Sequence, residues 1–414
     1  MASTKESNSK ALPAALTGIK VVDLTQFEAG TSCTETLAWL GAEVIKVEPP
    51  VHGERGRFAS TEKAGLDSYY FILLNANKQG ITCNLKHEKG KELLGKMIEQ
   101  ADVVIENMSP GKIEQLGFGY EDVKKVNPRV IYAQIKGFPP DGPWAKFLAF
   151  DMIAQSTGGS VFSTGAEGGP PMRPGPTLAD TGAGLHCAIG ILAALFQRQA
   201  AGIGQRIEVS MQEATINFSR IAFSSQLMWG KPMERNGNQS VLGTSAPSDL
   251  FACKGDGKND YAFIYTARSG NLHWHRLLKV MGREDLKDDP RFASPEQRVK
   301  HLKEVEALVA PWCAERTKIE VMETLGAAGV PVGAVLDTAE LMADPHLRKR
   351  GMFVTIDHPV RGKVTIPGWP VKMSNSFVPA ETSPLLGQHN EEVYGKWLGI
   401  APEEVRKMKD QGII

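Results

Sequence analysis

Short β-type runs alternate with helix-type runs from residue 19 to residue 135, and this alternation limits the fold more than any other feature of the sequence. The apolar, β-branched runs lie at 19–24, 43–47, 81–85, 103–105 and 130–135. Strands that alternate with helices form a parallel sheet, because a parallel crossover needs a connection of about helix length. We therefore expect an α/β fold with a Rossmann-like parallel sheet, whose ligand lies at the carboxyl ends of the strands.

The first βαβ unit, residues 19–48, is similar to the start of a dinucleotide-binding fold, so a dehydrogenase is one alternative. Between Asp23 and Thr34 the only glycine is Gly30, whereas a pyrophosphate turn follows the pattern G-x-G-x-x-G. The missing glycines disfavour a dehydrogenase and leave Glu48 as an ordinary charge at a strand end.

Composition excludes several classes of function. Lys plus Arg and Asp plus Glu both number 47, so no net field attracts nucleic acid or an anionic membrane surface. The 5 cysteines are widely spaced without a CxxC pair, which indicates reduced thiols and no metal site. The first ten residues lack the apolar core of a secretory signal, and His186 interrupts the most apolar helix. We expect a cytoplasmic protein that binds neither nucleic acid nor membrane.

One acidic residue, Asp180, precedes a long apolar helix that ends near residues 202–204. An acid in this place is first of all a helix N-cap, which bonds the free amides of the first turn. The same geometry suits a nucleophile, because the helix dipole and amide donors keep a carboxylate ionised. Gly182 and Gly184 would also let a bulky substrate approach the backbone. The residues alone leave both roles open.

Lysines cluster at the predicted strand ends, at Lys46, Lys78 and Lys86. Such lysines are commonly solvated, but strand ends of a parallel sheet are also where phosphates bind. The spacing does not decide between the two.

Taken together, the residues from Gly18 onward resemble the class III CoA-transferases, the family of formyl-CoA:oxalate and carnitine CoA-transferases. The resemblance lies in VVDLTQFEAGTSCTETLAWLGAEVIKVE, NANKQGITCNLK, ADVVIENMSPGKIEQLGFGYE, the segment from LADTGAG to GIGQ, AAGVPVGAV and PLLGQHNEEV. It implies a large Rossmann-like domain built from residues 17–225 and 331–414, and a smaller α+β domain at 226–330. Residues 1–16 are polar and aperiodic, and we expect a loose tail there. The family further implies an interlocked, ring-like homodimer, with a heteromer as the alternative.

The resemblance also implies a chemistry. Asp180 falls on the family's catalytic aspartate, which forms a mixed anhydride and then an aspartyl-CoA thioester, and Glu28 is a second candidate catalytic carboxylate. CoA thioesters are then substrates, and no permanently bound cofactor is expected. The loop at 237–243 falls where the family has a glycine-rich lid. The positions expected to line the CoA site are Lys46, Asn77, Lys78, Asn107 and Met108, with Lys78 assigned to a CoA phosphate.

Two departures from related patterns narrow the function. Formyl-CoA members place a glutamine where this sequence has Glu28, whose charge would repel a small dianion such as oxalate. The α-methylacyl-CoA racemases share the aspartate but need a histidine where this sequence has Phe150, which cannot carry a proton. With Met228 and Trp229, these residues suggest a roomier pocket for a larger or aromatic carboxylic acid, and a donor such as succinyl-CoA. A racemase and one subunit of a heteromeric transferase remain the alternatives.

Overall fold

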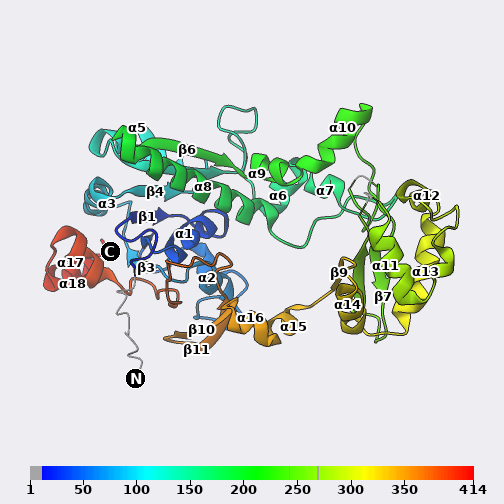
Figure 1. Ribbon diagram of the computed structural model, residues 1–414. Coiled ribbons are helices and arrows are strands. Elements are labelled where there is room, and N and C mark those ends of the chain that lie inside the picture. The colour runs from blue at the N-terminus through cyan, green and yellow to red at the C-terminus, as the bar shows by residue number, and fades with distance from the viewer. Residues whose placement is uncertain (1–11, 242, 268–269) are drawn as a thin grey trace, which may run out of the picture. The chain divides into compact units, whose positions relative to one another are not determined.

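The computed structural model describes residues 12–241, 243–267 and 270–414, and the chain divides into two compact units (Figure 1). The first unit consists of the chain up to Gly159 together with Pro174–Phe218 and Arg348–Ile414. The second unit consists of Ser160–Arg173 and Ser219–Leu347. The first unit is therefore built from three separate segments of the chain.

A six-stranded parallel sheet forms the centre of the first unit, in the order β3-β2-β1-β4-β5-β6. This is the doubly wound order of Rossmann-like folds, in which the direction of winding reverses between β1 and β4. The α/β prediction is therefore confirmed. The strands are β1 (Lys20–Leu24), β2 (Glu43–Glu48), β3 (Gln79–Thr82), β4 (Val103–Glu106), β5 (Ile131–Lys136) and β6 (Gln205–Ser210).

Helices cover both faces of this sheet, because successive strand residues point to opposite sides. Val22 and Val104 join the core on one face, whereas Val21 and Val103 join the core on the other. The first face is covered by α3 (Glu88–Gln100), α5 (Tyr120–Val126), α17 (Asn390–Leu398) and α18 (Pro402–Asp410). The second is covered by α1 (Ala29–Trp39), α6 (Asp151–Thr157), α8 (Leu178–Ala201) and α9 (Met211–Phe218).

The end of the chain is fastened to the edge strand β3. The Asn390 side chain accepts from the Thr82 N–H at 2.9 Å and donates to the Thr82 hydroxyl at 2.8 Å. A hairpin of β10 (Phe353–His358) and β11 (Gly362–Pro367) forms a smaller core with Trp39 and Ile72. The N-terminal end of the described chain is attached as well, because Leu16 packs on the sheet core and its N–H donates to the Leu40 carbonyl at 2.9 Å. The expected tail is therefore too long by several residues, and residues 1–11 lie outside the described part.

The second unit contains an antiparallel sheet in the order β7-β8-β9. Its strands are β7 (Ser248–Ala252), β8 (Tyr261–Tyr265) and β9 (Val332–Ala334), and they pack on α11 (Leu272–Met281), α13 (Leu302–Ala314) and α14 (Lys318–Ala327). The expected boundary at 330 is wrong, because β9 pairs with β8 and belongs to this sheet. The chain leaves the first unit after Phe218, at the end of α9. The remaining helices are α2 (Tyr69–Leu74), α4 (Lys112–Gln115), α7 (Ser160–Ser163), α10 (Phe223–Trp229), α12 (Pro295–Lys300), α15 (Thr338–Ala343) and α16 (Pro345–Lys349), with short 3-10 turns at Arg55–Phe58, Arg220–Ala222 and Glu284–Leu286.

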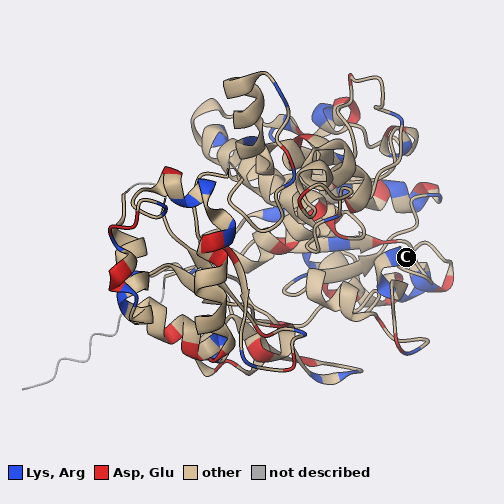
Figure 2. Ribbon diagram, turned by 90° about the vertical axis from the view of Figure 1, so that its right-hand side faces the viewer, with Lys and Arg blue, Asp and Glu red and all other residues tan. Residues whose placement is uncertain are grey.

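Helix α8 is long and apolar enough to cross a membrane, but half of its most apolar 18-residue window is buried. Its buried residues, such as Ile191 and Leu195, belong to the core between α8 and the sheet. Apolar character of this kind is expected of a core helix. Basic and acidic residues are interspersed along the ribbons, as the equal charge totals imply (Figure 2). All 5 cysteines are free and buried.

Candidate active site

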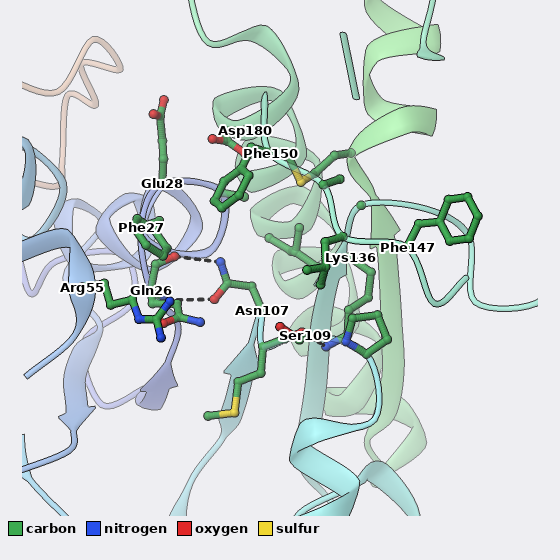
Figure 3. Close-up of a pocket in the computed structure, with 18 residues that line it drawn as sticks. Gln26, Phe27, Glu28, Arg55, Asn107, Ser109, Lys136, Phe147, Phe150 and Asp180 are labelled. Atoms are coloured by element: carbon green, nitrogen blue, oxygen red, sulfur yellow. Dashed lines mark hydrogen bonds between the residues drawn. The ribbon is translucent and has the colours of Figure 1, made fainter. Parts of the chain in front are cut away.

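A cavity of about 340 Å³ lies at the carboxyl ends of β1, β4 and β5 (Figure 3). It therefore occupies the place where the winding of the sheet reverses, the usual ligand site of such folds. The turns after the three strands form its floor, and the start of α8 supplies one wall. The lining residues are Gln26, Phe27, Glu28, Ala29, Arg55, Asn107, Met108, Ser109, Pro110, Ile135, Lys136, Gly137, Phe147, Leu148, Ala149, Phe150, Asp180 and Met211.

The turn after β1 is held in an uncommon backbone conformation. Phe27 has a φ of 58°, in the left-handed region that non-glycine residues rarely adopt. Asn107 fixes the preceding residue, since its side chain accepts from the Gln26 N–H and donates to the Gln26 carbonyl, both at 2.8 Å (Figure 3). Glu54 fixes Phe27 by accepting from its N–H at 2.9 Å. These bonds set the direction in which Glu28 leaves the turn.

Asp180 lies within the first turn of α8 and not before it, because the helix begins at Leu178 with Thr177 as its N-cap. The helix-capping acceptor comes from a distant residue. The buried Asp151 carboxylate accepts from the N–H groups of Ala179 at 3.0 Å and Asp180 at 3.4 Å. The N-cap role considered for Asp180 is therefore filled by Asp151. Among the described residues no side chain donates a hydrogen bond to the Asp180 carboxylate, which faces the cavity.

The electrostatic surroundings of Asp180 differ from the expectation. Burial, together with the nearby charges of Glu28 and Asp151, raises the pKa of Asp180 to about 7. The predicted depression by amide donors is wrong, because the first-turn amides are directed at Asp151. A carboxylate with this pKa is half-ionised near neutral pH, and it is a stronger nucleophile than an ordinary aspartate.

Glu28 lies beside Asp180 and is bonded to the same helix turn. Its Oε1 accepts from the Thr177 hydroxyl in a short hydrogen bond and from the Thr181 hydroxyl at 2.9 Å. Its Oε2 lies 3.5 Å from the Tyr70 hydroxyl. Burial and the nearby carboxylates, Glu28 foremost, raise the pKa of Tyr70, which therefore stays a neutral donor. The structure thus brings together both carboxylates predicted as catalytic.

The glycines after Asp180 serve packing and not substrate access. A Cβ at Gly184 would lie 2.6 Å from the Ala29 carbonyl of α1, and a Cβ at Gly182 would overlap the Phe218 ring of α9. Both glycines are needed because neighbouring helices approach the α8 backbone closely. The prediction that they admit a bulky substrate is therefore wrong.

The positions predicted to bind CoA separate into two groups. Asn107 and Met108 line the cavity, although both ends of the Asn107 amide are already bonded to Gln26. Asn77 lies elsewhere, where its side chain donates to the Pro379 carbonyl at 2.7 Å and accepts from the Glu381 N–H at 3.0 Å. It fastens the C-terminal segment and does not line the cavity.

The two lysines of this prediction are buried beneath the site. Lys46 Nζ lies 3.3 Å from the Glu54 carboxylate, and Lys78 Nζ lies 3.2 Å from the Asp23 carboxylate, with no side-chain exposure at either lysine. Both ammonium groups are satisfied by protein atoms and neither borders the cavity. We therefore assign them to the support of the site, where Lys46 holds Glu54 and thereby the turn at Phe27, and not to a CoA phosphate.

Four residues near the site were missed from the sequence: Glu54, Tyr70, Asp151 and Thr177. Each acts on a residue remote in the chain, so local patterns carry no signal for three of them. Asp151 is the exception, because it directly follows Phe150, a position that the comparison with the racemases had already singled out. The predicted lid at 237–243 belongs to the second unit, and its role stays a prediction.

Comparison with known proteins places this geometry in a family. The model of CoA-transferase family III matches residues 16–390. Two curated relatives are named formyl-CoA:oxalate CoA-transferase. The protein from Streptomyces coelicolor is 41% identical, and the match covers 97% of this chain and 99% of that protein. The protein from Rhodopseudomonas palustris is 37% identical, and the match covers 97% of each chain. The crystal structure of a CAIB/BAIF family protein from Brucella suis has a TM-score of 0.81 and 30% identity, and covers 94% of this chain and 100% of that one. The nucleophile segment, the sheet order and the cavity thus agree with sequence similarity along the whole chain, and the chain belongs to CoA-transferase family III.

Proposed function

We propose that this protein transfers CoA from an acyl-CoA to a carboxylic acid, with Asp180 as the covalent nucleophile. The observation that carries the proposal is the Asp180 carboxylate itself, which lies in the cavity wall while Asp151 bonds the helix amides in its place. A carboxylate that has neither a capping role nor an ion-pair partner among the described residues costs stability, and such groups are kept mainly where chemistry needs them.

The steps conserve the activation of the acyl group. The Asp180 carboxylate attacks the thioester carbonyl of the donor, so the C–S bond breaks and CoA leaves as a thiolate, giving a mixed anhydride. The thiolate then attacks the Asp180 carbonyl carbon, which forms an aspartyl-CoA thioester and releases the first acid. The acceptor carboxylate attacks the carbonyl carbon of this thioester, so the C–S bond breaks, CoA leaves again as a thiolate and a second anhydride forms. Attack of the thiolate on the acceptor's carbonyl carbon then yields the new acyl-CoA and restores Asp180.

A second cavity of about 670 Å³ offers a place for the rest of CoA. It is lined by the loops at 47–55 and 83–86 and by residues after β4. Its exposed basic residues Arg55, Lys86 and Lys112 have no ion-pair partner among the described residues, so they suit phosphate groups. We place the nucleotide here and the pantetheine arm along the residues common to both cavities, which are Gln26, Arg55, Met108 and Ser109.

A homodimer is part of the proposal. The outer face of α8 exposes Leu185, Ile189 and Phe196, the last at 77%. An exposed apolar row on the helix that carries the nucleophile indicates a protein partner. We take the partner to be a second copy of this chain. Light scattering of the purified protein should then show a dimer, and Phe196→Asp should weaken it. A heteromeric transferase would instead give a monomer that lacks transfer activity.

The experiment that tests the function is a panel of donors and acceptors with mass spectrometry of the acyl-CoA products. The donors are acetyl-CoA, formyl-CoA and succinyl-CoA. Succinyl-CoA is favoured from the sequence, and formyl-CoA appears, together with the acceptor oxalate, in the names of the relatives. Asp180→Asn should lose transfer by several orders of magnitude, since an amide oxygen is a weak nucleophile. The matched control is Asp141→Asn, an exposed carboxylate outside the cavity, which should retain transfer. Full transfer in Asp180→Asn would refute the proposal.

A further inference from the structure

The cavity has an acidic end and a basic end. Glu28 and Asp180 lie at one end, and Arg55 and Lys136 lie toward the other (Figure 3). Lys136 is neutralised locally, because its Nζ lies 2.7 and 2.8 Å from the two oxygens of Glu106. Arg55 borders both cavities, so its charge acts where CoA is proposed to enter. The acidic end is therefore left for the acyl group and the acceptor.

Glu28 has unused capacity to accept hydrogen bonds. Only 8% of the residue is exposed, and no basic side chain of the described residues forms an ion pair with it. The two threonine hydroxyls bond Oε1, whereas the Tyr70 hydroxyl lies 3.5 Å from Oε2, at the limit of a hydrogen bond. A buried carboxylate without a cation or a full set of donors is costly. A ligand that supplies a donor to Oε2 would recover this cost.

The position of Glu28 relative to the nucleophile follows from the helix. Thr177 is the N-cap of α8 and Thr181 lies one turn further along, with Asp180 between them. Because Glu28 bonds both threonines, its carboxylate lies beside this helix turn, close enough for its charge to raise the pKa of Asp180. A substituent a few bonds from the reacting carboxyl carbon would therefore face Glu28.

We propose that Glu28 selects the acceptor, favouring acids that carry a hydroxyl or ammonium group near the reacting carboxylate and rejecting acids that carry a second carboxylate. This inference rests on the proposed CoA transfer. Phe27 and Phe150, whose rings meet edge to face with centroids 6.0 Å apart, provide an apolar wall for the linking carbons. Aromatic rings also tolerate an ammonium group.

The size of the effect follows from Coulomb's law. Two like charges about 6 Å apart at an effective dielectric constant of about 20 repel by about 2.8 kcal/mol, or roughly 100-fold in a rate ratio. Because the cavity is open to water, we expect at least about 10-fold discrimination. The same repulsion would act on the free carboxylate of a succinyl group, so succinyl-CoA should be a weaker donor than butyryl-CoA, in contrast to the expectation from the sequence.

The test uses four acceptors that differ only in the terminal group: butyrate, 3-hydroxypropanoate, 3-aminopropanoate and succinate. With acetyl-CoA as donor, kcat/KM of the wild-type protein for the hydroxy or the amino acid should exceed that for succinate at least about 10-fold. Glu28→Gln should reduce this ratio by a similar factor, because the amide removes the repulsion. Ratios within one variant cancel any general loss of active protein. Asp141→Asn should leave the ratios unchanged.

Two outcomes overturn the inference. The first is a wild-type protein that uses succinate as well as or better than the other acids, which would point to Arg55 as the receiver of the second carboxylate. The second is a Glu28→Gln variant in which the ratio of kcat/KM for the hydroxy or amino acid to kcat/KM for succinate is unchanged. If that variant loses all transfer, the ratio measured for the wild-type protein alone decides the question. Exchange of labelled CoA into acetyl-CoA without acceptor separates these failures from a failure of the proposed function. Exchange needs only Asp180, so its absence, with no transfer to any acid, refutes the transferase itself.

Discussion

The replacement Asp180→Asn should stabilise the folded protein at alkaline pH while it abolishes transfer. The pKa of Asp180 is raised from 3.8 to about 7 in the folded state, so the folded protein binds a proton more tightly than the unfolded chain. The free energy of unfolding of the wild-type protein therefore falls relative to that of an uncharged variant as pH rises from about 4 to about 7, and this difference is constant above that range. The full shift corresponds to about 4 kcal/mol at 1.36 kcal/mol per pKa unit, and to about 2–3 kcal/mol between pH 5 and pH 8. Asparagine carries no charge and escapes this penalty.

The assay is urea unfolding of wild type and Asp180→Asn at pH 5 and pH 8, at one protein concentration because a dimer's stability depends on it. The difference between the proteins at each pH cancels the titration of all other groups. We expect the advantage of Asp180→Asn to grow by about 2–3 kcal/mol at pH 8, and Asp141→Asn to show no such growth. A helix cap would behave differently, because asparagine caps a helix about as well as aspartate, so the variant would show no growing advantage at pH 8. Equal changes in stability at pH 5 and pH 8 in Asp180→Asn would therefore refute the site geometry.

Three further predictions follow from the same residues. Deletion of residues 1–11 should leave transfer and assembly intact, because the contacts of Leu16 are retained; a loss of either would show that the segment is needed. No deuterium should enter the α-carbon of a chiral 2-methylacyl-CoA in deuterated water, because Phe150 cannot carry a proton, and incorporation as fast as transfer would favour a racemase. The transfer rate should rise with pH through about 7 as Asp180 ionises. Glu28→Gln should lower the pH at the midpoint of this rise, because it removes a neighbouring negative charge. A transfer rate that does not change with pH would contradict the raised pKa.

The sequence was sufficient for the parts of the fold that depend on local patterns. The alternation of β-type and helix-type runs predicts the parallel sheet, because alternate strand residues such as Val21 and Val22 must be buried on opposite faces. Asp180 could be singled out because it precedes a long apolar run. The first residue of α8 could not be predicted from the sequence, because the hydrogen bonds that stabilise its first turn go to Asp151, which lies on α6.

The roles of charged residues were harder to predict, because burial is decided by partners that are distant in sequence. Lys78 reads as a surface lysine after a turn, yet its ammonium group lies against Asp23, Thr34 and Asn75 in the interior. Asn107 reads as a ligand contact, yet it bonds the Gln26 backbone. In both cases the side chain bonds to protein atoms that shape the site. Only the three-dimensional structure distinguishes such a supporting residue from one that contacts the substrate.

Covalent trapping on Asp180 tests the central claim most directly. The wild-type protein is incubated with an acyl-CoA donor and no acceptor, treated with hydroxylamine or borohydride, digested and mapped by mass spectrometry. Hydroxylamine converts an aspartyl-CoA thioester into a hydroxamate, and borohydride reduces it to an alcohol, so either reagent leaves a mass change on the modified residue. We predict that this change lies on the peptide containing Asp180 and is absent when donor is omitted. A modification on Glu28, or an unmodified Asp180 peptide from protein that is transferring CoA, would contradict the account.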